Sequence, residues 1–127
     1  MILGTGVDTV SLSRFESKLA ETPRLKDRLF LDIETVNDGA EASVQTLAGR
    51  FAAKEAVAKA LGAPAGLSWQ DCEILIGERG KPYLELTGTV AAEAKPGDVI
   101  ITLGAGDVSS IGPLIIEELH KHYDPAS

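Results

Sequence analysis

Apolar residues follow two different spacings along the first third of the chain, and each spacing predicts an element. Residues 2–10 form an apolar run rich in β-branched side chains, so we expect a strand there. Over 12–20 the apolar positions share one helical face, and Ser13 and Glu16 have the spacing of a capping box, so we expect a helix. A second, shorter helix is expected over 24–31.

The middle of the chain combines an acidic stretch with a long helical segment. Residues 32–46 are acidic and contain turn residues, so we expect this stretch to begin as a loop. A segment rich in alanine and leucine predicts a long helix from about residue 42 to Gly62, a residue type that commonly ends helices. Pro64 lies just beyond and would prevent the helix from continuing.

Turn residues and apolar runs in the last third of the chain predict a hairpin and three further elements. The two strands of the hairpin are separated by residues 77–82, which contain two glycines and a proline. The predicted elements are strands over 72–76, 83–87 and 99–103 and helices over 89–94 and 113–122.

Composition narrows the class of protein. The 127 residues are 44% hydrophobic and 24% charged, with a mean hydropathy of +0.07, values typical of a soluble globular protein with a single domain. The apolar runs fall well below the roughly 20 residues that a membrane-spanning helix requires. The sequence shows no secretory signal and has one cysteine, Cys72, so we expect a reducing, cytoplasmic setting.

Charge argues against one class of partner and leaves two interpretations of a basic stretch. A net charge of −7 and an isoelectric point near 4.7 argue against general nucleic-acid binding, which depends on lysine and arginine neutralising phosphates. Residues 14–28 nevertheless carry a net charge of +2, which leaves −9 for the rest of the chain. This stretch suits either an acidic protein partner or a solvated helix face with internal salt bridges. Its basic residues are Arg14, Lys18, Arg24, Lys26 and Arg28.

The long helix carries the residues with the clearest chemical potential. Glu55 and Lys59 are four residues apart, so the plain interpretation is a surface salt bridge worth about 0.3–0.5 kcal/mol. Asp8 changes this interpretation, because an ionised carboxylate within an apolar strand needs a counter-charge or a metal ion. Two carboxylates from different elements are suitable ligands for Mg²⁺, because they leave coordination positions on the ion for phosphate oxygens. Arg50 and Lys54 on the same helix are compatible with a structural role.

Three motifs give these residues a family context. They are Gly-Val-Asp-Thr-Val over 6–10 followed by Arg14 and Phe15, Phe-Ala-Ala-Lys-Glu-Ala within 47–61, and Gly-Lys-Pro-Tyr-Leu-Glu-Leu-Thr-Gly over 80–88. In this order they resemble the holo-acyl-carrier-protein synthase family of 4′-phosphopantetheinyl transferases. The resemblance implies an α+β fold with a long helix packed on an antiparallel sheet. It also implies transfer of 4′-phosphopantetheine from coenzyme A to a serine of acyl carrier protein, with release of adenosine 3′,5′-bisphosphate, in fatty acid biosynthesis.

The resemblance also assigns roles to individual residues. Asp8 and Glu55 would bind Mg²⁺ and act in catalysis, with Glu55, through a water molecule, as the first candidate for the general base. Contacts with coenzyme A would come from Lys59, Gly62, Lys81 and Pro82. Contacts with acyl carrier protein would come from Arg14, Lys18, Arg24 and Arg28. Members of the family are typically trimers with active sites between subunits, so a homotrimer is expected.

The end of the chain departs from this pattern. The family usually closes with strands that carry a Ser-His-Asp element, whereas this chain has only His120 and His122, both in the predicted terminal helix. Residues 95–122 instead resemble the C-terminal end of a Mur-type amino-acid ligase, with a strand, a turn over 104–107 and a closing helix. Two alternatives therefore stay open: a non-catalytic family member that binds carrier protein or coenzyme A, and a ligase-related fragment that uses this turn.

Overall fold

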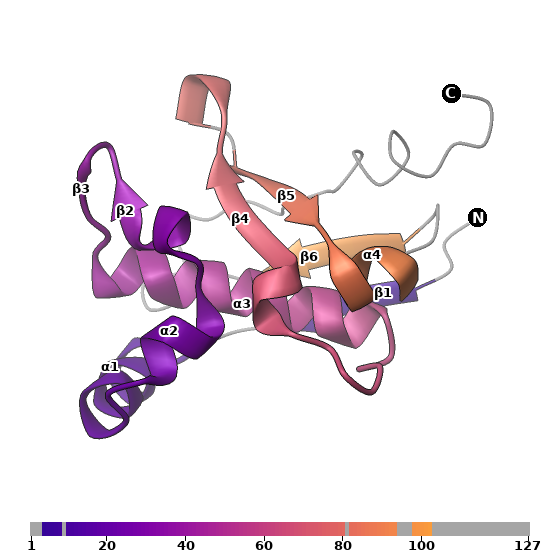
Figure 1. Ribbon diagram of the computed structural model, residues 1–127, viewed down its shortest axis with the longest axis horizontal. Helices are drawn as coiled ribbons and strands as arrows, with labels where there is room; N and C mark the ends of the chain where they lie inside the picture. The colour runs from indigo at the N-terminus through magenta and orange to yellow at the C-terminus, as the bar shows by residue number, and fades with distance from the viewer. Residues whose placement is uncertain (1–3, 9, 81, 94–97, 103–127) are drawn as a thin grey trace.

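The computed structural model describes residues 4–8, 10–80, 82–93 and 98–102, with side chains for 10–80 and 82–93 (Figure 1). The helices are α1 (Leu12–Glu21), α2 (Leu25–Leu29), α3 (Val44–Ala60) and α4 (Gly88–Glu93). The strands are β1 (Gly4–Asp8), β2 (Val36–Asn37), β3 (Ala40–Glu41), β4 (Cys72–Ile76), β5 (Pro82–Leu86) and β6 (Asp98–Thr102). Three short 3₁₀ helices are η1 (Asp32–Thr35), η2 (Trp69–Asp71) and η3 (Glu78–Gly80). This mixture of helices and small sheets agrees with the predicted α+β class.

Helix α3 runs through the middle of the molecule and contacts strands on different sides of it (Figure 1). Its start is fixed by Ser43, whose hydroxyl oxygen accepts a hydrogen bond from the Thr46 amide at 3.1 Å. Its end is followed by Gly62, which has a φ of +75° and so ends the helix as predicted. Buried alanines along α3, among them Ala48, Ala52 and Ala56, let neighbouring backbones approach the helix closely.

The strands of the described residues form three separate pairs, and only the β4–β5 pair was predicted. β4 and β5 form the expected antiparallel hairpin, with Cys72 opposite Leu86, and α3 contacts β4. β1 and β6 pair in parallel from Gly4 opposite Asp98 to Asp8 opposite Thr102, and both contact α3. A parallel pair joins segments far apart in the sequence, which no local pattern could reveal. The long helix therefore packs on a parallel pair as well as on an antiparallel one.

Among the residues whose side chains the structure describes, the core consists of two apolar clusters arranged along α3. The first lies beside the β4–β5 hairpin and α4 and contains Ala53, Ala56, Val57, Cys72, Ile74, Leu84 and Val90. The second lies beside α1 and α2 and contains Phe15, Leu29, Phe30, Ala42, Leu47 and Ala48. The Phe51 ring stacks on Phe15 at 5.6 Å between centroids and meets the Trp69 ring edge-on at 5.5 Å. Aromatic contacts thus attach α1 and η2 to the same helix.

Two local predictions were wrong. α1 begins at Leu12 with Ser11 in the N-cap position and without a side-chain cap, so the capping box predicted at Ser13 and Glu16 does not form. Residues 32–46 contain more structure than the predicted loop, because η1 is followed by the small β2–β3 hairpin. Its turn places two consecutive residues, Asp38 and Gly39, at positive φ, as a tight two-residue hairpin turn requires.

Several sequence predictions concern segments outside the described residues. The helix predicted over 113–122, with His120 and His122, lies there, as does the turn predicted over 104–107. The strand predicted over 99–103 corresponds to β6. Within the described part of the chain, no helix combines the length and the apolar character needed to cross a membrane.

The buried thiol of Cys72 leads to a prediction about alkaline stability. Burial raises the pKa of Cys72 from 9.0 to about 12, so above pH 9 the unfolded chain loses this proton before the folded protein does. We therefore expect this group to lower the free energy of unfolding by about 1.4 kcal/mol per pH unit between pH 9 and 12. Urea unfolding of the wild type and of Cys72→Ala between pH 7 and 11 measures the difference. Parallel pH profiles for the two proteins would contradict the prediction.

Candidate functional site

The two predicted metal-binding carboxylates lie on elements that touch each other. Asp8 is the last residue of β1, and β1 packs against α3, which carries Glu55 near its middle. Glu55 is half-buried. In the part of the chain that the structure describes, no group of three or more His, Cys, Asp or Glu residues could hold a metal ion. The two carboxylates that the sequence predicts would suit Mg²⁺, which usually completes its coordination with water and substrate phosphates.

The two groups of predicted coenzyme contacts lie apart. Lys59 is exposed in the last turn of α3, and Gly62 follows the end of this helix. Pro82 is exposed at the start of β5, beside the η3 turn, where Arg79 and Gly80 have positive φ. Figure 1 places this turn at the tip of the β4–β5 hairpin, well away from the end of α3. Lys81 lies outside the described residues.

The basic residues predicted to contact carrier protein share one part of the molecule. Arg14 and Lys18 lie on α1, Arg24 precedes α2, and Arg28 lies within α2; all four side chains are exposed. The fifth base of this stretch, Lys26, forms an exposed salt bridge with Glu41 at 3.0 Å. The stretch therefore combines a salt bridge to Glu41, which lies outside it, with an accessible positive surface.

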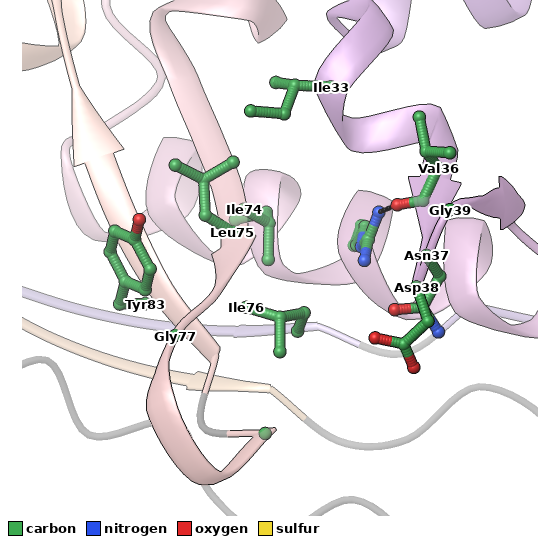
Figure 2. A pocket seen from close by; sticks show the side chains of 12 residues that line it. Ile33, Val36, Asn37, Asp38, Gly39, Ile74, Leu75, Ile76, Gly77 and Tyr83 are labelled. Carbon is green, nitrogen blue, oxygen red and sulfur yellow. Dashed lines mark hydrogen bonds between the residues drawn. The ribbon is translucent and has the colours of Figure 1, made fainter.

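A groove opens between the β2–β3 hairpin and the β4–β5 hairpin, and the sequence did not indicate it (Figure 2). Its volume is about 750 Å³. Exposed apolar side chains face it from both walls: Ile33 and Val36 on one side and Ile76 on the other. Gly80 and Tyr83 also line it, so the groove borders the turn that the sequence assigned to the coenzyme.

Arg50 lines this groove and has a structural role, as the sequence allowed. It is only 5% exposed, and its Nη1 donates hydrogen bonds to the carbonyl oxygens of Glu34 and Val36. Burial lowers the pKa of Arg50, and the nearby Glu34 carboxylate partly offsets this effect. The Nε atom of Arg50 has no hydrogen-bond partner among the described residues.

The most buried polar group of the described chain is an ion pair between Glu34 and Lys54, 2.9 Å apart, with both side chains fully enclosed. A structural role for Lys54 was compatible with the sequence. Glu34 was not identified, because the acidic stretch 32–46 was expected to begin as a loop. No spacing rule connects residues twenty positions apart, so the available signal was only the presence of apolar Ile33 and Val36 around Glu34.

Comparison with known proteins places this chain in one family. Residues 4–103 match the model of the 4′-phosphopantetheinyl transferase superfamily. A holo-[acyl-carrier-protein] synthase of Salinispora arenicola is 57% identical over 95 residues, which cover 74% of this chain and 78% of the relative. One from Streptomyces griseus is 52% identical, with the same coverage of both chains.

Solved structures give the same result. A holo-(acyl-carrier-protein) synthase from Bacillus anthracis in complex with CoA (3′,5′-ADP) has a TM-score of 0.57 and is 38% identical, covering 69% of this chain and 78% of its own. The Chronobacterium ammoniagenes ACPS-CoA complex has a TM-score of 0.62 and is 29% identical, covering 71% and 75%. These comparisons do not support the ligase resemblance of residues 95–122. The superfamily match continues through residue 103, and β6 within it completes the parallel pair with β1.

Proposed function

Because the chain belongs to the 4′-phosphopantetheinyl transferase superfamily, we propose that it transfers 4′-phosphopantetheine from coenzyme A to a serine of acyl carrier protein. The observation that carries this proposal is the contact between β1, which ends at Asp8, and α3, which carries Glu55. The contact supports a shared role for two residues that lie in separate sequence motifs. The relatives named holo-[acyl-carrier-protein] synthase and the solved complexes with coenzyme A point to the same reaction.

The chemistry requires one bond to form and one to break. The serine oxygen of the carrier attacks the phosphorus that bears the pantetheine arm, and the bond from this phosphorus to the bridging pyrophosphate oxygen breaks. Adenosine 3′,5′-bisphosphate leaves with the bridging oxygen. The proton of the serine hydroxyl must pass to a base, and Glu55, acting through a water molecule, is our candidate because it is half-buried at the predicted site. The nucleophile belongs to the partner, so this chain needs no nucleophile of its own.

A magnesium ion is part of the proposal, with Asp8 and Glu55 as the residues that would hold it. Two carboxylates on touching elements fit the donor set that Mg²⁺ takes when phosphates supply further ligands. When bound, the ion would neutralise the pyrophosphate and stabilise the charge that develops during transfer. Lys59, exposed one turn beyond Glu55, would contact the phosphates.

Coenzyme binding by Lys59, Gly62, Lys81 and Pro82 is best explained by an assembly of several copies. The end of α3 and the tip of the hairpin lie apart within one chain, and a neighbouring copy would supply the second group of contacts (Figure 1). We therefore expect a homotrimer with sites between subunits. Light scattering should give about three times the 13.3 kDa mass of one chain, and a monomer at micromolar concentration would contradict this expectation.

The basic surface on α1 and α2 is the proposed docking site for the carrier, an acidic protein partner. Reversing two of its charges in Arg14→Glu/Lys18→Glu should raise the KM for the carrier about tenfold or more at low salt, because charge complementarity guides association. The KM for coenzyme A should stay unchanged, and the difference should shrink as salt is added. Arg14→Lys/Lys18→Arg, which keeps both charges, is the matched control. Equal carrier kinetics for the reversed and control variants would exclude this surface.

Mass spectrometry tests the activity itself. Apo acyl carrier protein incubated with this protein, coenzyme A and Mg²⁺ should gain the mass of one phosphopantetheine group. A carrier whose acceptor serine is replaced by alanine should gain none. Binding of coenzyme A without any mass gain would instead favour a non-catalytic family member.

A cytoplasmic location and a role in fatty acid biosynthesis complete the proposal. The location is supported by the single cysteine, which is buried and unpaired, as is usual in a reducing compartment. The pathway role follows from the substrate, because acyl carrier proteins carry growing acyl chains on the phosphopantetheine arm. Cell fractionation and the acyl-carrier state of cells depleted of this protein would test the two points.

A further inference from the structure

The Lys54 ammonium is fully enclosed, and each of its three protons has an acceptor. It donates to the Glu34 carboxylate at 2.9 Å and to the carbonyl oxygens of Trp69 and Cys72 at 2.8 and 2.5 Å. The nitrogen also lies 5.6 Å from the centre of the Phe30 ring. An ammonium group has only three donors, so its position is determined completely by these groups.

The Glu34 carboxylate is held from two further directions. One oxygen also accepts a hydrogen bond from the Leu31 amide at 3.0 Å, and the other accepts one from the Ile74 amide at 3.0 Å. The pair therefore joins η1, α3 and β4. One turn earlier on α3, Arg50 donates to the carbonyl oxygens of Glu34 and Val36, which fixes the same segment a second time.

Stability alone does not explain a charged pair at this place. The pair lies next to apolar residues of both core clusters, including Phe30 and Ile74. Removing two charges from water costs several kcal/mol per ion, and apolar residues of similar volume often stabilise a fold as well or better. Directed hydrogen bonds do what apolar contacts do not: they fix the rotation of a helix and its position along its own axis.

Glu55 is the neighbour of Lys54 on α3, about 100° further round the helix and about 1.5 Å further along it. We infer that Glu34 and Lys54 are positioning residues, which set the rotation and the axial position of α3 so that Glu55 faces the end of β1 correctly for transfer. This inference rests on the proposed function. An error of about 1 Å in such a position lowers the rate about a hundredfold.

A double variant that removes both charges of the pair, Glu34→Gln/Lys54→Met, tests this inference, because neither partner is left as an ion without its counter-charge. We expect the folded double variant to lose about a hundredfold in kcat, with a change of less than about threefold in the KM for coenzyme A. We also expect its Mn²⁺ dissociation constant, measured by electron paramagnetic resonance without coenzyme or carrier, to rise about tenfold or more. Val90→Ala, which opens a small cavity in the first core cluster without touching the pair, is the matched control and should retain both properties.

The outcomes separate the inference from the proposed function. If the wild type binds Mn²⁺ but transfers nothing, the proposed function is wrong, and the metal affinity of the double variant alone decides the inference. If the wild type does not bind Mn²⁺, both the proposed metal site and the inference are wrong. The inference is also overturned if the double variant keeps wild-type kcat and metal affinity, or if Val90→Ala loses as much as the double variant does.

Discussion

Replacing Glu55 by glutamine is expected to lower kcat for phosphopantetheine transfer about a thousandfold, and Asp8→Asn should have an effect of the same size. Each substitution keeps the size of the side chain but removes a negative charge from the proposed metal site. Glu55 is half-buried and lies on the helix that β1 contacts, so the loss should affect the chemical step more than the fold. Single-turnover mass spectrometry at saturating coenzyme A and carrier measures it.

The matched control is Glu93→Gln, which removes an exposed carboxylate from the end of α4. It should transfer at the wild-type rate. The two site variants should also need more Mg²⁺ for half of their maximal rate, because each lacks one of the two proposed ligands. Activity within about tenfold of the wild type in either variant would contradict the assigned mechanism, since the loss of a transition-state charge contact costs several kcal/mol.

Replacing Lys54 alone by methionine is expected to lower the free energy of unfolding by about 3–5 kcal/mol. The substitution leaves the Glu34 carboxylate enclosed without its counter-charge, and it removes the donor from the carbonyl oxygens of Trp69 and Cys72. Each buried acceptor left without a donor adds to the cost. Urea unfolding at pH 7 measures the loss.

Lys18→Met gives the comparison, because Lys18 is exposed on α1 and its substitution should change stability by less than about 1 kcal/mol. The double variant Glu34→Gln/Lys54→Met should recover much of the stability lost in Lys54→Met, because the buried Glu34 carboxylate is no longer left without the Lys54 counter-charge. A single Lys54→Met variant as stable as Lys18→Met would show that the buried pair contributes nothing to folding.

Local chemistry made much of the fold predictable. Gly62 identified the end of α3, and the glycines and proline of the 77–82 segment identified the β4–β5 hairpin. The buried face of α3 could not be predicted. The alanines of this helix are distributed around its circumference, so no single apolar stripe distinguishes one side from another. For the same reason, the sequence could not show that Lys54 is enclosed whereas Lys59, little more than one turn later, is exposed.

The candidate site was predictable only in part. The sequence motifs indicated Asp8 and Glu55, and the contact of β1 with α3 agrees with a shared role. Glu34 could not be identified, because its partners lie at positions 54 and 74, and pairing across such separations depends on the assembled fold. The parallel pairing of β1 with β6 was missed for the same physical reason.

The Glu34–Lys54 pair also has a consequence for how the chain reaches its native state. Its partners come from residues 31–34, from α3 and from residues 69–74, so the ammonium finds all its acceptors only when these three segments have converged. A partly assembled chain that excluded water from this region would have to hold an unmatched charge there, which costs several kcal/mol. Partly folded states are therefore penalised, and the two apolar clusters on either side of the pair should form and melt as one cooperative unit.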